Sequence, residues 1–439
     1  MLVRHVDKYL HEWKAGGARH ALMLMGARQV GKTTAVREFA RREYDSLAEV
    51  NFLGNPLAVE SLSGVTDADD LLARLSVLTG TRLEPKKTLL FLDEIQECQD
   101  LLTWMKFLAE RTNLDTVLSG SLLGLDAYVH VRSLPVGFLR RCRMYPLSFE
   151  EFCWASGVLP EVFGRARDCY QKLEPVPDYL HKRLMSLFYR YLMVGGMPEA
   201  VTTYREHSDL VATRSVQRDI YDLYLDDIAK YVDSPVEARQ IKMVYESIPS
   251  QLNAPSKRFK YARLEKRIRF ANSETAFDWL SQAGIAISVP RARSSDFPLG
   301  LSEDRSLFKL FLNDVGLLTS RLTGAVDIEL LNGRGTMNFG SIFEAVVAQE
   351  LVSAGNEVWY LSSKKMGEVD FAIQSMTAGT VLPIEVKSGK DYARHSALSN
   401  LLADEARGIE RAVVLHDGNV EVRGRVAYLP VYMAGMLRA

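Results

Sequence analysis

The chain has 439 residues, and its 54 Lys and Arg residues nearly balance its 55 Asp and Glu residues. This length predicts two to four domains, since domains of roughly 100–200 residues are usual. With 47% hydrophobic and 25% charged residues, the composition is that of a soluble globular protein and excludes disorder over the whole chain. The balanced charge excludes nucleic-acid binding through bulk positive charge, although a local basic patch stays compatible with it.

The N-terminal segment, MLVRHVDKYLHEWKAGG, lacks the apolar core of a secretory signal. No apolar run approaches the ~20 residues that span a bilayer. The four cysteines form no CxxC pair and are too few for a disulfide framework. We therefore expect a cytoplasmic protein with no membrane partner.

The first third of the chain alternates short apolar runs with amphipathic stretches. The apolar runs lie at 21–25, 50–53, 88–92 and 116–119, and the amphipathic stretches lie at 6–13, 32–43 and 101–111. Buried parallel strands are continuous apolar runs, and helices connect them. This alternation predicts a parallel βαβ sheet.

After Pro146 the pattern changes to helices interrupted by Gly and Pro, including the turn Gly195-Gly196-Met197-Pro198. Three short helices and a strand at 285–289 are expected within 240–290, an order typical of a winged helix. A helix at 341–352 and a meander of strands at 357–361, 368–373 and 381–386 then predict a C-terminal α/β domain.

One motif directly follows the first predicted strand. It fits G-x-x-x-x-G-K-[ST] and consists of Gly26, Ala27, Arg28, Gln29, Val30, Gly31, Lys32 and Thr33, followed by Thr34. Its backbone N–H groups and the N-terminus of the following helix favour phosphate. Lys32 is expected to neutralise the β- and γ-phosphates, and Thr33 to bind Mg²⁺. The motif therefore predicts an ATP site with ATP and Mg²⁺ as cofactors.

A second apolar run, Leu89-Leu90-Phe91-Leu92, ends in Asp93-Glu94. Asp93 is expected to hold Mg²⁺, and Glu94 to act as the general base that polarises the attacking water. Ser119 follows the next strand and is a candidate sensor of the γ-phosphate, although a simple Ser-Gly turn explains it nearly as well. Arg140, Arg141 and Arg143 are open candidates for an arginine finger or for a solvated basic turn.

These segments resemble a known family. GARQVGKTT, LLFLDEIQE, VLSGSLLG, YPLSFEEF and YLMVGGMPEAV are similar to AAA-type P-loop ATPases of the AAA_14 type, which carry a C-terminal DUF4143 domain. FKLFLNDVGLL, GSIFEAVVAQEL, EVDFAI and PIEVKSG resemble that C-terminal domain, and the domain itself resembles the PD-(D/E)xK nuclease fold. Many relatives have a basic residue after the glycine that precedes YPLSF, whereas this chain has Phe138 after Gly137.

The C-terminal carboxylates carry a second candidate chemistry. Asp370 is followed fifteen residues later by Glu385-Val386-Lys387. Glu385 and Lys387 lie on one face of a strand, because side chains alternate. Asp370 and Glu385, with Glu344 from the preceding helix, are expected to hold Mg²⁺, and Lys387 to orient the attacking water and stabilise phosphate charge. The alternative is a nuclease-derived binding domain whose acids are silent, since fold does not establish chemistry.

A basic stretch lies within the predicted winged helix. It contains seven cations and one acid, and the cations are Lys257, Arg258, Lys260, Arg263, Lys266, Arg267 and Arg269. Such a stretch, with aromatic residues interleaved, favours contact with DNA or RNA phosphates. The following helix at 273–283 carries acids and no cation, so base-specific recognition is not expected. A solvated face, or a patch that docks onto the acidic surface of the ATPase part, is the alternative.

Together these features predict a multidomain α/β protein. The expected parts are a P-loop ATPase core with a parallel sheet at 1–148, a helical lid at 149–205, a helical and winged-helix middle at 206–300, and a nuclease-like domain at 301–439. The predicted function is Mg²⁺-dependent ATP hydrolysis that controls the C-terminal domain, acting on nucleic acid. An ATP-switched regulatory protein with a silent C-terminal domain is the alternative, and a homo-oligomer is compatible with both.

Overall fold

The computed structural model describes residues 2–18, 20–121, 137–232, 234–254, 257–260, 274–322, 339–389 and 391–439. The chain forms two compact units. The first comprises residues 3–145 with 282–284, and the second comprises 146–281 and 285–439. No helix in these ranges is long and apolar enough to cross a membrane.

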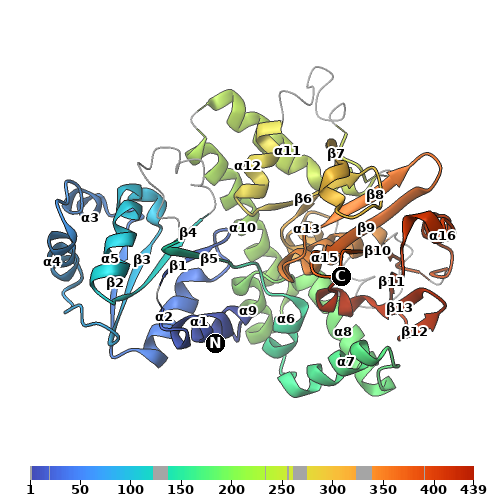
Figure 1. Ribbon diagram of the computed structural model, residues 1–439, viewed down its shortest axis with the longest axis horizontal. Helices are drawn as coiled ribbons and strands as arrows, with labels where there is room; N and C mark the ends of the chain where they lie inside the picture. The colour runs from blue at the N-terminus through green and yellow to red at the C-terminus, as the bar shows by residue number, and fades with distance from the viewer. Residues whose placement is uncertain are drawn as a thin grey trace. The chain divides into compact units, whose positions relative to one another are not determined.

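The first unit is built on a five-stranded parallel sheet in the order β2-β3-β4-β1-β5 (Figure 1). Its strands are β1 (Ala21–Met25), β2 (Ser46–Asn51), β3 (Thr88–Asp93), β4 (Asp115–Gly120) and β5 (Leu139–Arg143). Its α-helices are α1 (His5–Ala15), α2 (Lys32–Glu43), α3 (Pro56–Ser61), α4 (Ala68–Thr79) and α5 (Met105–Arg111). The predicted parallel α/β sheet is confirmed.

Burial explains why these segments are strands. Every residue of β1, β3 and β4 is buried. On one face Met23, Leu90 and Leu118 join a core with Leu71 of α4 and Leu108 of α5. Helix α2 contacts β2, β3 and β4 without joining this core, so helices cover both faces of the sheet.

The second unit combines helices with an eight-stranded mixed sheet in the order β12-β13-β11-β10-β9-β8-β6-β7. Its strands are β6 (Ala286–Ala292), β7 (Glu303–Leu312), β8 (Trp359–Ser363), β9 (Gly367–Ser375), β10 (Thr380–Val386), β11 (Ala412–His416), β12 (Glu421–Arg423) and β13 (Val426–Pro430). Strands β8, β9 and β10 pair antiparallel, as the predicted meander requires. Strands β10, β11 and β13 are parallel.

The helices of this unit are those coloured from green to orange, with α16 in red, in Figure 1. They are α6 (Phe149–Ala155), α7 (Pro160–Lys172), α8 (Asp178–Val194), α9 (Pro198–His207), α10 (Leu210–Tyr231), α11 (Pro235–Leu252), α12 (Glu274–Gln282), α13 (Val315–Arg321), α15 (Gly340–Ser353) and α16 (Ser396–Ala403). Residues 149–205, which were predicted as a lid, belong to this unit. The predicted domain boundary at residue 300 lies between β6 and β7, and these two strands pair with each other in the same sheet.

The predicted winged helix is not confirmed, and residues 255–256 and 261–273 of its expected span lie outside the described residues. The strand expected at 285–289 is β6, which pairs with β7 and β8 in the large sheet instead of forming a separate wing. Helix α11 continues unbroken for 18 residues where short helices were expected. Local propensity identified the strand, but its pairing partners lie up to about 70 residues away and are set by tertiary packing.

The GGMP turn connects α8 with α9 and packs against two distant segments of the second unit. The Gly196 N–H donates to the Asp314 carboxylate at 2.6 Å, and the Gly196 carbonyl accepts from Leu147 N at 2.6 Å. A methyl group on Gly196 would lie 2.1 Å from the Leu147 carbonyl oxygen, so only glycine fits. Three motifs of the family resemblance, around residues 147, 196 and 314, therefore meet at one point for a structural reason.

Candidate functional site

The phosphate-binding motif forms the connection from β1 to α2. Gly31 precedes α2 with φ of 94°, a left-handed conformation that glycine adopts without strain. A methyl group on Gly26 would lie 2.2 Å from the Met144 carbonyl oxygen, so the backbone there needs a residue without a side chain. The loop and the N-terminus of a 12-residue helix therefore lie at the carboxyl end of a central strand.

Lys32 is the first residue of α2 and is 5% exposed. Its Nζ donates to the carbonyl oxygens of Gly26 at 3.0 Å and Ala27 at 2.9 Å. These bonds hold the ammonium group inside the loop, beside the backbone that would surround a phosphate. The arrangement places a positive charge where the β- and γ-phosphates of a nucleotide would bind.

Asp93 lies at the centre of a polar network on the carboxyl ends of three strands. One carboxylate oxygen accepts from Thr33 Oγ1 and Asn51 Nδ2, both at 2.9 Å, and the other accepts from Ser119 Oγ. Burial raises the pKa of Asp93, and the hydrogen bonds from Ser119 and Thr33 oppose that rise. Asp93 and Thr33 supply the carboxylate and hydroxyl oxygens that Mg²⁺ prefers, so the donor set fits this ion.

Glu94 follows Asp93 in a left-handed conformation with φ of 56°. Its Oε2 accepts from Gln96 Nε2 at 2.5 Å. Gly120 at the end of β4 leaves room for the Gln96 side chain, because a methyl group on Gly120 would lie 2.9 Å from Gln96 Oε1. The strand end therefore gives Glu94 a defined position beside Asp93.

Sequence reasoning missed three residues of this site. Asn51 ends β2 in register with Asp93, and a polar residue at that strand end was a usable signal. Gln96 holds Glu94, and its motif position alone did not reveal this contact. Arg4 donates to the carbonyls of Val30 at 2.9 Å and Tyr145 at 2.7 Å and so supports the loop from the start of α1. Nothing in the local sequence connects Arg4 with residue 30.

The candidate arginine fingers lie on β5 at the edge of the sheet. The Arg140 guanidinium is 4.9 Å from the centre of the Tyr9 ring. Arg143 is in register with Met25, the last residue of β1 before the loop. Among the described residues, no contact distinguishes a finger among the three arginines.

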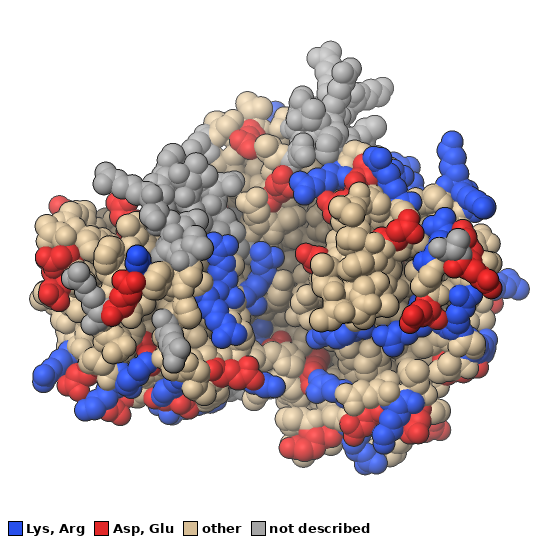
Figure 2. Space-filling model, viewed as in Figure 1, with Lys and Arg blue, Asp and Glu red and all other residues tan. Residues whose placement is uncertain are grey.

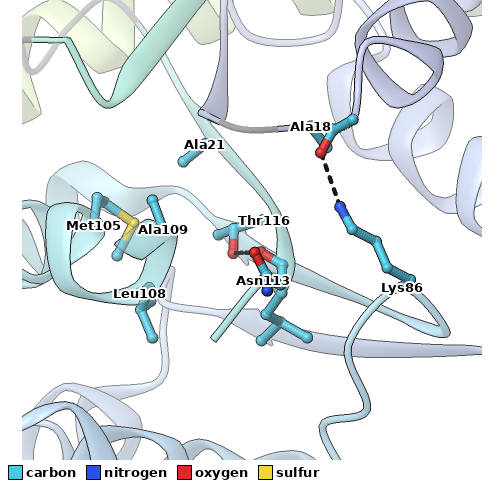
Figure 3. Close-up of a pocket in the computed structure, with 10 residues that line it drawn as sticks. Ala18, Ala21, Lys86, Met105, Leu108, Ala109, Asn113 and Thr116 are labelled. Carbon is cyan, nitrogen blue, oxygen red and sulfur yellow. Dashed lines mark hydrogen bonds between the residues drawn. The ribbon is translucent and has the colours of Figure 1, made fainter. Parts of the chain in front are cut away.

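The first unit also contains a cavity of about 230 Å³ at the opposite end of the sheet. It is bordered by Ala21, the first residue of β1, and by Thr116 near the start of β4. Figure 3 shows Met105, Leu108 and Ala109 on one side of it and Lys86 on the other. Because β1 runs from this cavity to the phosphate-binding loop, the cavity and the loop are separate features.

The C-terminal acids converge where β9 and β10 pair. Asp370 of β9 accepts from the backbone N–H of Val386 at 2.9 Å, and Lys387 Nζ lies 2.8 Å from Glu385 Oε1. Burial raises the pKa of Glu385 to about 7, and the nearby charge of Asp370 adds to the rise. Among the described residues, Glu385 Oε2 is a buried atom without a hydrogen-bond partner. The predicted set of Asp370, Glu385 and Lys387 therefore lies in one place.

Lys309 joins this cluster from β7, and sequence reasoning missed it. Its side chain is fully buried, and its Nζ lies 3.3 Å from Glu344, 3.1 Å from Glu368 and 3.6 Å from Asp370. Burial opposes the charged form, but these carboxylates outweigh it and raise the pKa of Lys309. In this arrangement, no three acidic, His or Cys side chains of the described ranges are placed to hold a metal ion.

The basic stretch is described only at its start. Arg263, Lys266, Arg267 and Arg269 lie outside the described residues. Lys257 pairs with Glu344, Arg258 pairs with Glu368 at 2.8 Å, and Lys260 is exposed. Figure 2 shows acidic and basic side chains interspersed over the described surface of that view. Two of the three described cations thus contact carboxylates of the C-terminal part of the chain, and not the ATPase surface that the docking alternative named.

Family models match three parts of the chain. An AAA domain model matches residues 18–153, which contain the loop, Asp93 and Ser119. A domain of unknown function, DUF4143, matches residues 339–433, and another, DUF8612, matches residues 185–326. The chain therefore contains an AAA domain of the P-loop ATPase class and a DUF4143 domain.

One curated relative and several solved structures are similar to this chain. An uncharacterized protein of Methanocaldococcus jannaschii, MJ1637, is 22% identical over 449 residues, covering 98% of this chain and 86% of the relative. A Walker-type ATPase of Pyrococcus abyssi is 14% identical and aligns with 73% of this chain and 95% of its own, with a TM-score of 0.44. RuvB of Thermotoga maritima is 16% identical over 69% of this chain and 90% of its own, with a TM-score of 0.29.

Proposed function

We propose that the first unit binds ATP with Mg²⁺ and hydrolyses it to ADP and phosphate. The observation that carries this proposal is the convergence of Thr33, Asp93 and Ser119 beside the loop that holds Lys32. The ends of β3 and β4 contribute Asp93 and Ser119, and the start of α2 contributes Thr33, as parallel α/β sheets do at ligand sites. The AAA domain match over residues 18–153 supports the same activity.

Each residue has a distinct role in this proposal. Lys32 and the loop N–H groups neutralise and orient the phosphates, and Thr33 and Asp93 hold the Mg²⁺ ion. When bound, this ion would supply positive charge that stabilises the transferred phosphoryl group. Glu94 accepts a proton from the attacking water. Ser119 donates a hydrogen bond to Asp93 and acts as the sensor of the γ-phosphate.

Steady-state phosphate release by the full chain with Mg²⁺ and ATP tests this proposal. Lys32→Ala should abolish nucleotide binding and hydrolysis, because it removes the cation inside the loop. Lys8→Ala, which changes an exposed lysine on α1, is the matched control and should keep wild-type activity. Failure of the wild type to bind ATP would overturn the proposal.

We also propose that the nucleotide state of the first unit controls the second unit. In this proposal the carboxylates of the second unit hold a divalent cation, and the unit cleaves phosphodiester bonds of nucleic acid. The convergence of Asp370, Glu385 and Lys387, with one unpartnered buried oxygen on Glu385, favours this chemistry. The alternative is a silent domain that recognises a partner. It is favoured by the lysines that already neutralise Glu344 and Glu368.

Cleavage of single- and double-stranded DNA and RNA with Mg²⁺ or Mn²⁺, with and without ATP, separates these two alternatives. A nuclease should lose cleavage in Asp370→Ala while its ATP hydrolysis continues. Two results together would overturn the nuclease proposal: the wild type cleaves none of these substrates, and Asp370→Ala leaves the activity of the protein in cells unchanged. The regulatory alternative would then be favoured. ATP hydrolysis is measured separately, so its outcome does not depend on this one.

A further inference from the structure

The cavity of about 230 Å³ in the first unit is bordered by backbone in an unusual conformation. Ala18, Lys86 and Asn113 border it with φ of 45°, 64° and 49°. Residues with a side chain rarely adopt this left-handed conformation, and it persists where the surrounding structure holds it, as at ligand sites. The other two such residues described in this unit, Gln29 and Glu94, belong to the nucleotide site. The described left-handed residues with side chains therefore lie at two places in the first unit, the nucleotide site and this cavity.

Lys86 supplies a hydrogen-bond donor to the wall of the cavity. Its Nζ donates to the Gly17 carbonyl oxygen at 2.9 Å and to Asp115 Oδ1 at 2.6 Å. An ammonium group has three hydrogens, so these described contacts leave one of them for a ligand. The charge of Lys86 is already balanced by Asp115, which also accepts from Tyr44 Oη at 2.9 Å. A ligand of the cavity therefore needs an acceptor for Lys86 but no charge of its own.

The side of the cavity opposite Lys86 is apolar (Figure 3). Met105 and Leu108 of α5 line that side and are each 1% exposed, and Ala109 adds a small side chain beside them. An apolar cavity of about 150 Å³ holds a benzene molecule, so about 230 Å³ has room for roughly nine non-hydrogen atoms. This is the size of one aromatic ring that carries a short polar group.

We propose that this cavity is a second ligand site, which takes a small neutral aromatic molecule with a hydrogen-bond acceptor, such as an aromatic carboxamide. The ring lies against Met105 and Leu108, and the acceptor faces Lys86. Ligand sites combine an apolar wall with a few polar groups that fix the orientation of the ligand. The site is separate from the phosphate-binding loop, because the two lie at opposite ends of β1, and the inference does not depend on ATP hydrolysis.

Titration of benzamide against the full chain, followed by NMR of methyl-labelled methionine, tests this site. Benzamide matches the expected size, carries no charge and has a carbonyl acceptor. It should shift the methyl signal of Met105 with a Kd of about 1 mM, which is usual for so small a ligand. Toluene has a similar ring but no acceptor, so it should bind about tenfold more weakly because the hydrogen bond from Lys86 is missing.

Two variants fill the cavity from α5. Ala109→Phe should weaken benzamide binding at least about tenfold, because its ring takes the space of the ligand's ring, and Ala109→Leu should weaken it less. The two side chains differ in size, so the test does not depend on the larger one folding. Ala73→Phe, at an exposed position of α4, is the matched control and should keep the wild-type affinity.

Three results would overturn the proposed ligand site. An unchanged Met105 signal at benzamide concentrations well above the expected Kd would refute binding in the cavity. Equal affinity for benzamide and toluene would refute recognition through a hydrogen-bond acceptor. Wild-type affinity in both Ala109 variants would place the ligand elsewhere. ATP hydrolysis by the same samples is measured separately, so none of these results bears on the proposed ATPase.

Discussion

Replacement of Lys309 by methionine should destabilise the second unit specifically. The lysine side chain is fully buried, and its ammonium group lies within 3.6 Å of three carboxylates. Methionine keeps most of the apolar stem, so the loss is mainly electrostatic. Removal of one partner from a buried ion pair costs about 3–5 kcal/mol, because the remaining charges lack compensation.

The expected change in melting temperature follows from this free-energy cost and the size of the unit. Roughly 290 residues at about 2.1 cal/mol/K each give an unfolding entropy near 0.6 kcal/mol/K. A loss of about 3–5 kcal/mol therefore lowers the melting transition of this unit by about 5–8 °C.

Differential scanning calorimetry of the full chain measures this shift. Lys364→Met, at an exposed position in the turn between β8 and β9, is the control and should shift the transition by less than about 1 °C, as surface changes do. A shift of Lys309→Met no larger than that of the control would refute the argument that the ammonium group neutralises the cluster.

Four further predictions concern the nucleotide site and the core of the second unit, and the first three test the nucleotide site. Glu94→Gln should bind ATP with wild-type affinity but hydrolyse it about 10²–10⁴-fold more slowly, measured by phosphate release and by nucleotide fluorescence; an unchanged rate would exclude Glu94 as the base. Gly26→Ala should abolish ATP binding at any concentration that saturates the wild type, because its methyl group has no space; normal binding would contradict the loop geometry. Asn51→Ala should weaken Mg²⁺-dependent ATP binding about 10-fold by removing a charge-assisted hydrogen bond to Asp93, and equal affinity in nucleotide titrations would contradict that role.

The last prediction of this group concerns pH. Burial raises the pKa of Glu350 to about 8, above its unfolded value near 4.5, so the folded state holds an extra proton between these values. The stabilisation is full below pH 4.5 and is lost toward pH 8, by at most about 1.4 kcal/mol per pH unit. Glu350→Gln should therefore melt with a weaker pH dependence than the wild type between pH 5 and 8, and parallel profiles would contradict the burial argument.

Local sequence was enough for the strands that carry the nucleotide loop. The run at 21–25 is β1 in full, and the run at 88–92 is β3 with Asp93 added. These strands are buried on both faces, so their apolar runs are continuous and easy to recognise. By contrast, the sequence predicted β6 as part of a winged helix. The local sequence of a strand does not determine which strands it pairs with, and β6 pairs with β7 and β8.

The site residues also fall into two groups, those that the local sequence identifies and those that only the fold brings to the site. The loop 26–33 is contiguous, so its chemistry can be predicted from one stretch of chain. Asn51 and Arg4 reach the site only through a strand pairing and a helix that packs nearby, and neither has a motif of its own. The sequence also linked Asp370 with Glu385 correctly as neighbours, because two strands joined by a short connection pair with each other.

The near balance of acidic and basic residues in the chain corresponds, in the second unit, to buried acids that are paired with lysines. By itself the sequence determined that the chain carries a nucleotide loop, an acidic strand end and a C-terminal set of acids, since each is local in the chain. Only the tertiary structure decided that Lys309 and Lys257 lie on those acids, from 35 and 87 residues before Glu344. Buried charges must be compensated wherever the fold brings them together, and the compensating partner can come from any part of the chain.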